Sequence, residues 1–172
     1  EISDRIDMEI QGCNFAQKAI ESPIEGISLS PLSPAVNSDK NDFAPIPFRS
    51  NSLYFTSDDG GTAKIYKVEV STEQFNNRQE FDVSQLVEGH IANGSFTPDG
   101  MRFYFTQSEE VDGRMLTAIY FSAKENGGWS SPAKLPNYIN PEGYNSTQPY
   151  VLIQDNKEII YFSSDRDGGK GG

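Results

Sequence analysis

A tyrosine-centred strand followed by a polar turn occurs three times in this chain, and this repeat limits the folds open to it. The copies share an aromatic triplet, Leu-Tyr-Phe, Phe-Tyr-Phe or Ile-Tyr-Phe, centred on Tyr54, Tyr104 and Tyr161. About 50 to 57 residues separate successive tyrosines. A recurrence of this length is typical of blade repeats and solenoids.

Each repeat has room for four short strands. A segment with proline or aromatic residues precedes the aromatic strand, and a polar turn joins the two; in Thr97–Gly100, proline presets φ and glycine accepts a positive φ. A third strand is expected over Ala63–Val70 and Met115–Ala123. A fourth is expected around Glu80–Ser84 and Trp129–Leu135. Four short strands at this period predict a propeller blade, because a helical solenoid would show a 3.6-residue period.

The aromatic strand supports this prediction independently, because its apolar residues occupy both faces. Phe103 and Phe105 point one way and Tyr104 points the other, given the two-residue period of a strand. A strand that is buried on both faces lies between two neighbouring sheets. We therefore predict an all-β fold, a β-propeller with four-stranded antiparallel blades, of which about two and a half are present, preceded by one short α-helix.

The repeats also divide the chain. We expect an N-terminal helix and linker over residues 1–23 and a partial propeller over 24–172, with blades near 41–86, 87–137 and 138–172. Closed propellers typically have about four to eight blades. We therefore expect this one to continue beyond residue 172.

The N-terminal segment is the only one with a helical pattern. Ile6, Ile10, Cys13 and Ile20 fall close to one helical face, and Pro23 ends the segment. Cys13 could be a lipidated cysteine or a small buried residue on the helix face. Lipidation would need a hydrophobic run upstream, and the preceding residues are acidic and polar, so we predict a buried Cys13.

Composition excludes several classes of partner. The net charge of −11 argues against nucleic acid and anionic membrane surfaces, since both bind through cationic side chains. No window approaches 18 consecutive apolar residues, so no transmembrane segment is expected. No signal peptide opens the sequence, which leaves a mature protein, a fragment or a cytosolic protein open.

The sequence offers few candidates for chemistry, and we predict no catalytic, cofactor-binding or metal-binding residues. His90 is the single histidine, and no Gly-x-Ser-x-Gly motif accompanies it, so a turn residue is favoured over a catalytic base. Asp165 and Asp167 are spaced as in some calcium loops but lack the further ligands, and calcium binding there is left open. Trp129 could be an exposed, sugar-stacking residue, but packing is favoured.

Six runs of the sequence resemble a known repeat, namely 37–45, 53–57, 129–132 (with Leu135), 139–140, 145–149 and 160–172. Together they are similar to the WD40-like PD40 repeat, which is related to the TolB propeller. The resemblance covers roughly residues 24–172. The segment with Cys13 and Pro23 is similar to the linker of envelope proteins that carry a tetratricopeptide segment before the propeller and an OmpA-like domain after it.

This resemblance implies a non-catalytic binding or scaffold propeller in the periplasm of a Gram-negative bacterium, and it leaves outer-membrane association open. It implies a protein partner in the envelope, with the type IX secretion and gliding apparatus as the candidate complex, and peptidoglycan reached through a domain outside this chain. It implies no cofactor. The alternative is an accessory propeller of a serine peptidase or glycosidase whose catalytic part lies elsewhere.

Overall fold

The computed structural model describes residues 2–23, 25–58, 61–72 and 74–169. The end of the repeat-like run 160–172 therefore lies outside the described residues. The chain divides into two units, Glu1–Pro31 and Leu32–Gly172. The first unit contains one long helix, and the second contains all the strands.

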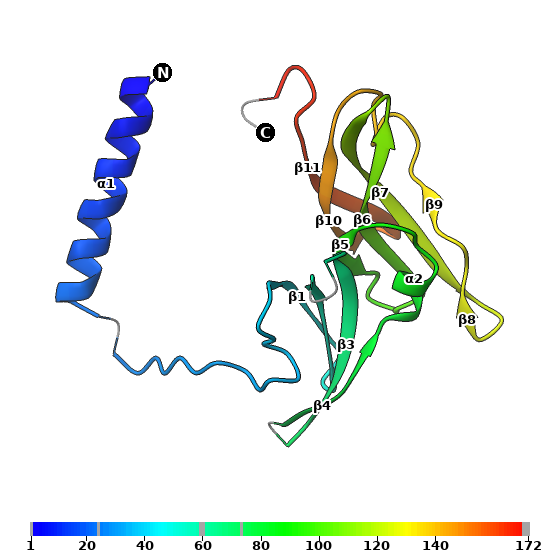
Figure 1. The fold of residues 1–172 in the computed structure, drawn as a ribbon, viewed down its shortest axis with the longest axis horizontal. Coiled ribbons are helices and arrows are strands. Elements are labelled where there is room, and N and C mark those ends of the chain that lie inside the picture. Colours follow the sequence, from blue (N-terminus) through cyan, green and yellow to red (C-terminus); the bar gives the residue numbers. More distant parts are fainter. Residues whose placement is uncertain (1, 24, 59–60, 73, 170–172) are drawn as a thin grey trace. The chain divides into compact units, whose positions relative to one another are not determined.

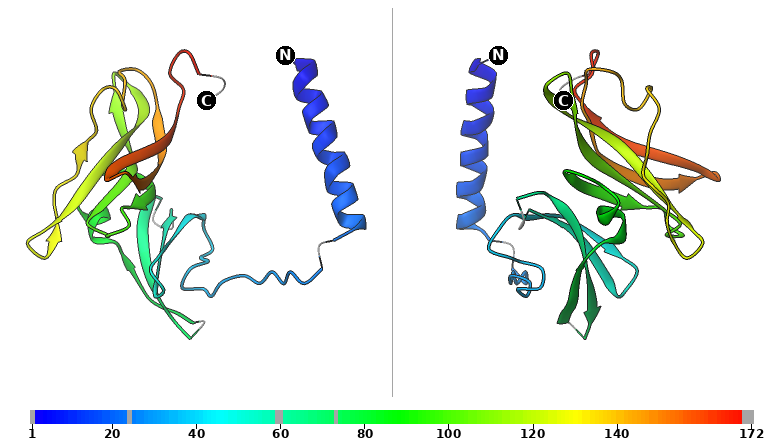
Figure 2. Two further views of the ribbon diagram at one scale, coloured as in Figure 1. Left: turned by 180° about the vertical axis from the view of Figure 1, so that it is seen from behind. Right: turned by 45° about the vertical axis from the view of Figure 1, so that its right-hand side comes forward.

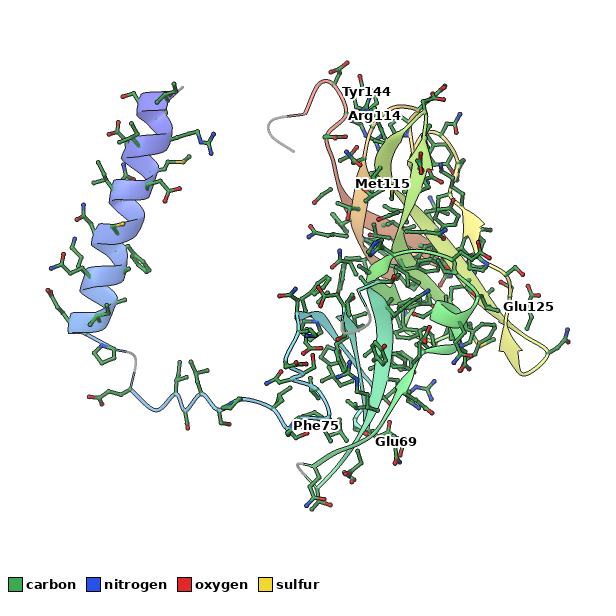
Figure 3. All side chains as sticks on the ribbon, in the orientation of Figure 1. Glu69, Phe75, Arg114, Met115, Glu125 and Tyr144 are labelled. Atoms are coloured by element: carbon green, nitrogen blue, oxygen red, sulfur yellow. The ribbon has the colours of Figure 1, made fainter. Side chains whose placement is uncertain are left out.

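Helix α1 spans Ile2–Glu21, which confirms the expected N-terminal helix. Asp4 in its first turn and Lys18 in its last turn complement the helix dipole. None of its residues is buried, and its side chains stand out from the ribbon (Figure 3). The prediction of a buried Cys13 is wrong, because nothing within this unit covers the helix face and the cysteine is exposed.

The first sheet is an antiparallel meander in the order β1-β2-β3-β4 (Figure 1). Its strands are β1 (Asp42–Phe48), β2 (Ser52–Ser57), β3 (Lys64–Ser71) and β4 (Gln74–Glu80). The fourth strand ends where the sequence predicted it to begin. Helix α2 (Asp82–Gln85) occupies most of the predicted stretch instead.

Helix α2 forms there because its residues are bonded to the third strand. Ser84 is buried, and its Oγ accepts a hydrogen bond from the Ile65 N–H at 2.9 Å. The N–H of Phe81 donates to the Ile65 carbonyl at 2.8 Å. The segment thus covers the end of β3 and does not extend the sheet.

The second sheet repeats the meander in the order β5-β6-β7-β8, and β9 also pairs with β7. Its strands are β5 (Ile91–Phe96), β6 (Arg102–Val111), β7 (Arg114–Glu125), β8 (Gly128–Trp129) and β9 (Ala133–Lys134). Two short strands, β8 and β9, together take the place of a fourth strand beside β7. Pro132, which lacks an N–H for the ladder, lies between the two pieces.

The third sheet is a hairpin of β10 (Ser146–Gln154) and β11 (Lys157–Ser164). Its two-residue turn, Asp155-Asn156, has φ values of 50° and 58°. Positive φ at both positions is the type I′ geometry, whose twist matches the flanking strands.

The three sheets stack in chain order, as Figures 1 and 2 show. Strand β5 packs on β1, β2 and β3, and β10 packs on β5, β6 and β7. This face-to-face stacking of antiparallel meanders is the arrangement of propeller blades, and it confirms the predicted fold class. The described sheets do not close into a ring.

The aromatic strands of the first two sheets are buried on both faces, as predicted. Tyr54 is 8% exposed and Tyr104 is 5% exposed. The aromatic strand of the third sheet, β11, differs, since Tyr161 is 60% exposed. The expectation of two buried faces therefore fails for β11, because no described element covers the outer face of the hairpin.

The first strand of each sheet, β1, β5 or β10, contains a bulge at the same place. Ala44, Asn93 and Gln148 have φ values of 50°, 49° and 55°, and the ladder register shifts at each of them. The Asn93 N–H donates to Thr56 Oγ1 at 3.2 Å, and the Gln148 N–H donates to Thr106 Oγ1 at 3.0 Å. The bulge therefore aims one backbone donor at the threonine of the preceding aromatic strand.

Candidate binding groove across the first strands

A groove of about 340 Å³ crosses the first strands of all three sheets. Segments of β1, β5 and β10 line it, together with Pro98 from the β5–β6 turn. Its main surfaces are prolines and aromatic rings, namely Pro45, Pro47, Pro98, Phe48, Phe96 and Tyr150. We call it the first-strand groove.

Tight packing fixes the floor of the first-strand groove. The rings of Phe48 and Phe96 lie 4.4 Å apart, centroid to centroid. A Cβ on Gly100 would lie 2.6 Å from Phe48 Cζ, and one on Gly94 would lie 2.1 Å from Phe103 Cζ. Both positions therefore need glycine, because any larger residue would displace an aromatic ring beneath the groove.

A buried hydrogen bond joins two of the strands that line the groove. The Val151 N–H of β10 donates to Ser95 Oγ of β5 at 3.0 Å. Both residues are buried. The two strands thus keep a fixed separation, and the groove is preformed on rigid elements.

Strand β1 lacks two backbone donors. Pro45 and Pro47 both lie in β1, which stands at one edge of the first sheet. Proline has no N–H to give. Proline at an edge strand prevents another strand from pairing there. The groove can therefore receive side chains, but its β1 edge does not support strand addition.

The lining of the first-strand groove carries no formal charge at neutral pH. Tyr150 is its single titratable side chain. Arg49 lies beside the groove. Its guanidinium carbon is 5.1 Å from the Phe48 ring centre, and its Nη2 donates a hydrogen bond to the Asp99 carbonyl at 3.4 Å. An apolar lining without an acid–base pair can bind apolar groups but offers no general acid or base.

A second cavity, of about 230 Å³, lies between the first and second sheets. Its lining includes Tyr54, Trp129, Lys67, Lys124 and Asp82. Burial raises the pKa of Tyr54 above its usual value, and Asp82 adds to this effect. The cavity combines aromatic walls with charges of both signs, so it favours no one charge on a ligand.

A polar cluster joins the second and third sheets. Glu158 of β11 accepts hydrogen bonds from the Tyr104 hydroxyl and from the Arg102 guanidinium. Burial, with the bond to Glu158, raises the pKa of Tyr104 to about 12. Glu158 raises the pKa of Arg102 as well. The cluster thus holds the hairpin on the second sheet with a neutral phenol and an ion pair.

His90 lies in the connection that leads into β5. Its Nδ1 accepts a hydrogen bond from the Ala63 N–H at 3.1 Å, and its carbonyl accepts one from the Ser108 N–H at 3.0 Å. No serine nucleophile is bonded to it among the described residues. The imidazole thus uses its acceptor nitrogen to join the first sheet to the second.

Asp165 and Asp167 hold the loop before β10 in place. Asp165 accepts hydrogen bonds from the Asn145 N–H at 2.6 Å and from Asn145 Nδ2 at 2.7 Å, which lower the pKa of Asp165. Asp167 accepts one from the Tyr144 hydroxyl at 2.5 Å. Within the described part of the chain, no group of three or more His, Cys, Asp or Glu is placed to hold a metal ion.

Trp129 packs against the interface between the first two sheets. Its ring centre lies 5.4 Å from that of Phe81, 6.2 Å from that of Phe96 and 5.5 Å from Lys124 Nζ. The ring is partly buried against the aromatic cluster.

Sequence reasoning missed the first-strand groove. The signal available was the proline content of the first strands, at Pro45, Pro47 and Pro149. Proline in a β-pattern indicates an edge strand. The sequence alone does not show that these edges lie side by side.

No protein-family model matches the chain, and no curated protein matches it. Among solved structures, the chain is similar to the crystal structure of TolB from Acinetobacter baumannii, with 15% sequence identity and a TM-score of 0.45. The match covers 78% of this chain and 32% of the TolB chain, so this chain spans about a third of that protein's length. None of the helices in the described residues is long and apolar enough to cross a membrane.

Proposed function

We propose that this chain is a non-catalytic protein-binding module whose first-strand groove takes apolar side chains of a partner polypeptide. One observation supports this above all. The groove spans all three sheets and is lined by prolines and aromatic rings without a charged side chain. Such a lining gains free energy by excluding water from apolar groups, at about 25 cal/mol per Å² buried.

The partner's contact is through side chains and not through an added strand, because the edge strand β1 contains Pro45 and Pro47, which have no N–H. Tyr150 is an exposed aromatic residue at the rim, and rigid aromatics of this kind are common binding hot spots. The net charge of −11 favours a partner segment that is basic outside its apolar anchor, since opposite charges speed association.

The setting we propose is the periplasm of a Gram-negative bacterium, with association at the outer membrane. The support is the resemblance of the repeats to PD40 propellers of envelope proteins. On the same basis we propose that the partner belongs to the type IX secretion and gliding apparatus. Peptidoglycan would then be bound by a domain outside these 172 residues.

Site-specific crosslinking tests the groove. A photo-reactive phenylalanine replaces Pro47 in the groove, and in a matched variant it replaces Glu69, which lies on β3 beyond β2 (Figure 3). In an envelope extract of the source bacterium, we expect a discrete adduct from position 47 and none from position 69. Adding Tyr150→Asp should abolish the adduct without changing the melting temperature, because Tyr150 is exposed.

Two results would contradict the proposal. Equal labelling from positions 47 and 69 would mean that contact is nonspecific, and an adduct that survives Tyr150→Asp would place the contact elsewhere. Mass spectrometry of the captured protein tests the setting separately. A protein outside the secretion and gliding apparatus would remove that assignment while leaving the groove as a binding site.

A further inference from the structure

The cavity of about 230 Å³ between the first and second sheets is lined by both of them, and we call it the inter-sheet cavity. The first sheet contributes three residues that are cross-strand neighbours on β2, β3 and β4, namely Tyr54, Lys67 and Gln79. The second sheet contributes Lys124 and Trp129, from β7 and β8. The inter-sheet cavity therefore lies within an interface whose two sides both belong to this chain.

A buried hydroxyl group at this cavity has no partner in the protein. Tyr54 is 8% exposed, and its ring centre lies 4.9 Å from that of Phe81 and 4.8 Å from that of Phe96. Among the described residues, none forms a hydrogen bond with the Tyr54 hydroxyl. Polar groups that are removed from water usually have a hydrogen-bond partner, because leaving one unpaired costs free energy. The hydroxyl is therefore suited to a hydrogen bond with a bound molecule.

Charged side chains of both signs line the same cavity. Lys67 and Lys124 are the cations, and Glu80 and Asp82 are the anions. Within the described part of the chain, none of the four forms an ion pair. Burial raises the pKa of Tyr54, and the nearby Asp82 carboxylate adds to this effect, yet no hydrogen bond joins the two groups. A simple anion or cation meets as many like charges here as opposite ones, whereas a zwitterion can pair with both signs.

We propose that the inter-sheet cavity binds a free α-amino acid with an apolar side chain. Its ammonium group donates to the Tyr54 hydroxyl and the Asp82 carboxylate, and its carboxylate accepts from the Lys67 ammonium. Its side chain lies against the rings of Phe81 and Phe96, which also line the cavity. The volume equals that of about eight water molecules at about 30 Å³ each, which suits a ligand of this size and not a polypeptide segment.

This inference goes beyond the proposed function, because it concerns a small molecule and a different set of polar residues. Phe48 and Phe96 line both the inter-sheet cavity and the first-strand groove. Tyr54, Lys67 and Asp82 line the inter-sheet cavity and not the groove. Substitution of these three residues therefore tests the amino-acid site, while the crosslink from position 47 tests the groove.

Tryptophan fluorescence measures binding at this site, because Trp129 is the single tryptophan of the chain and lines the cavity. The probes are L-leucine and L-phenylalanine. Each is compared with its two fragments, which are isocaproate and isoamylamine for leucine, and hydrocinnamate and phenethylamine for phenylalanine. The first fragment of each pair lacks the ammonium group, and the second lacks the carboxylate. We expect at least one amino acid to bind with a Kd of about 1 mM, and its fragments about tenfold more weakly.

Three substitutions test the individual contacts. Tyr54→Phe keeps the ring and removes the hydroxyl, Asp82→Asn removes the anion, and Lys67→Gln removes the cation. Each should raise the Kd about tenfold. Tyr54→Phe should not lower the melting temperature, because the hydroxyl has no partner in the protein, and Asp82→Asn changes an exposed residue. Lys157→Gln and Glu88→Gln are the matched controls, since both residues are exposed and lie outside the cavity lining.

Three outcomes would overturn the proposal. The first is a fluorescence spectrum that neither amino acid changes up to its solubility limit. The second is a fragment that binds as tightly as its amino acid, since the site would then not recognise a zwitterion. The third is a Kd that stays the same in Tyr54→Phe and Asp82→Asn, or that rises equally in the two controls, since either result would place the binding elsewhere. None of these outcomes changes the expected crosslink from the first-strand groove.

Discussion

The interface between the first and second sheets and the interface between the second and third sheets share one backbone geometry but differ in chemistry. In both, a left-handed bulge residue donates its N–H to a threonine of the preceding aromatic strand. The first interface is then filled by aromatic rings. The second is held by hydrogen bonds and an ion pair.

The first interface is an apolar cluster. Phe81 lies at its centre, with ring centroids 4.9 Å from Tyr54, 5.2 Å from Phe103 and 5.9 Å from Phe96. The pairs with Tyr54 and Phe103 are edge-to-face, the arrangement that aromatic quadrupoles favour. Its stability therefore comes from burial and close packing.

The second interface contains few rings. Tyr104 and Arg102 donate to Glu158, and the Thr117 N–H donates to Asn145 Oδ1 at 2.9 Å. The comparison shows that the backbone bond fixes the spacing of the sheets, while the side chains between them can be apolar or polar. Substitutions should then separate the contribution of the bulge hydrogen bond, which both interfaces share, from that of the aromatic or polar side chains, which differ.

The largest effect is expected at the centre of the apolar interface. Phe81→Ala should reduce the free energy of unfolding by about 3–5 kcal/mol, the usual range for deleting a buried aromatic ring. Phe43→Ala is the matched control, because Phe43 is 40% exposed at the edge strand β1 and should lose far less. Equal urea midpoints for the two variants would show that the aromatic cluster does not hold the first interface.

The hydrogen bond from the bulge N–H to the threonine hydroxyl should contribute the same free energy of unfolding in both interfaces. Thr56→Val and Thr106→Val each leave a bulge N–H without its acceptor and keep the side-chain shape. Each should lower the free energy of unfolding by about 1–2 kcal/mol, the lower part of the range for an unsatisfied donor, because each N–H is only partly buried. Denaturant melts of the two variants check this. A loss confined to one of them would mean that the bulge bond is not a common device.

Much of this architecture could be predicted from the sequence because it is encoded locally. The aromatic triplets around Tyr54 and Tyr104 have apolar residues on both faces, which only a sandwiched strand requires. The helix over Ile2–Glu21 follows from its isoleucine spacing and from Pro23. Both are properties of a few consecutive residues.

The features that could not be predicted depend on contacts between distant residues. Helix α2 replaces the expected strand because Ser84 bonds to Ile65, 19 residues away. Tyr161 has the same local sequence pattern as Tyr104, yet it is exposed because burial depends on whether another sheet covers it. The groove arises only when three first strands lie together, which no single segment encodes.

The polar interface should show a pH dependence that comes from Tyr104, in addition to the one that the raised pKa of Tyr54 gives the apolar interface. The pKa of Tyr104 is raised to about 12, chiefly by burial and also by Glu158, so the folded state holds this proton more tightly than the unfolded chain does. The resulting stability is full below pH 10 and is lost as the pH rises from 10 to 12. Tyr104→Phe should lower stability at neutral pH by about 1 kcal/mol and make the decline above pH 10 shallower.

Urea melts from pH 8 to pH 12 measure this decline. Tyr161→Phe is the control, because it removes an equivalent hydroxyl from an exposed residue and should leave the profile unchanged. Burial and Glu109 raise the pKa of Tyr120 to about 12, and burial raises the pKa of Tyr54, so both tyrosines contribute to the decline in each variant. A Tyr104→Phe profile parallel to the wild type would contradict a role for this phenol at the interface.

The smallest effect is expected for the ion pair of the polar interface. Glu158→Gln keeps an acceptor for the Tyr104 hydroxyl but removes the charge that faces Arg102, whose side chain is about half exposed. Partly exposed pairs contribute about 0.2–1 kcal/mol, and salt screens them. We therefore expect a loss in this range at low salt that shrinks in 1 M NaCl, where the Debye length is about 3 Å.

Glu110→Gln is the control, because Glu110 is exposed and lies on the same strand as Tyr104, and it should change the free energy of unfolding neither at low salt nor in 1 M NaCl. A loss for Glu158→Gln that is independent of salt would mean that packing, and not charge, joins the hairpin to the second sheet.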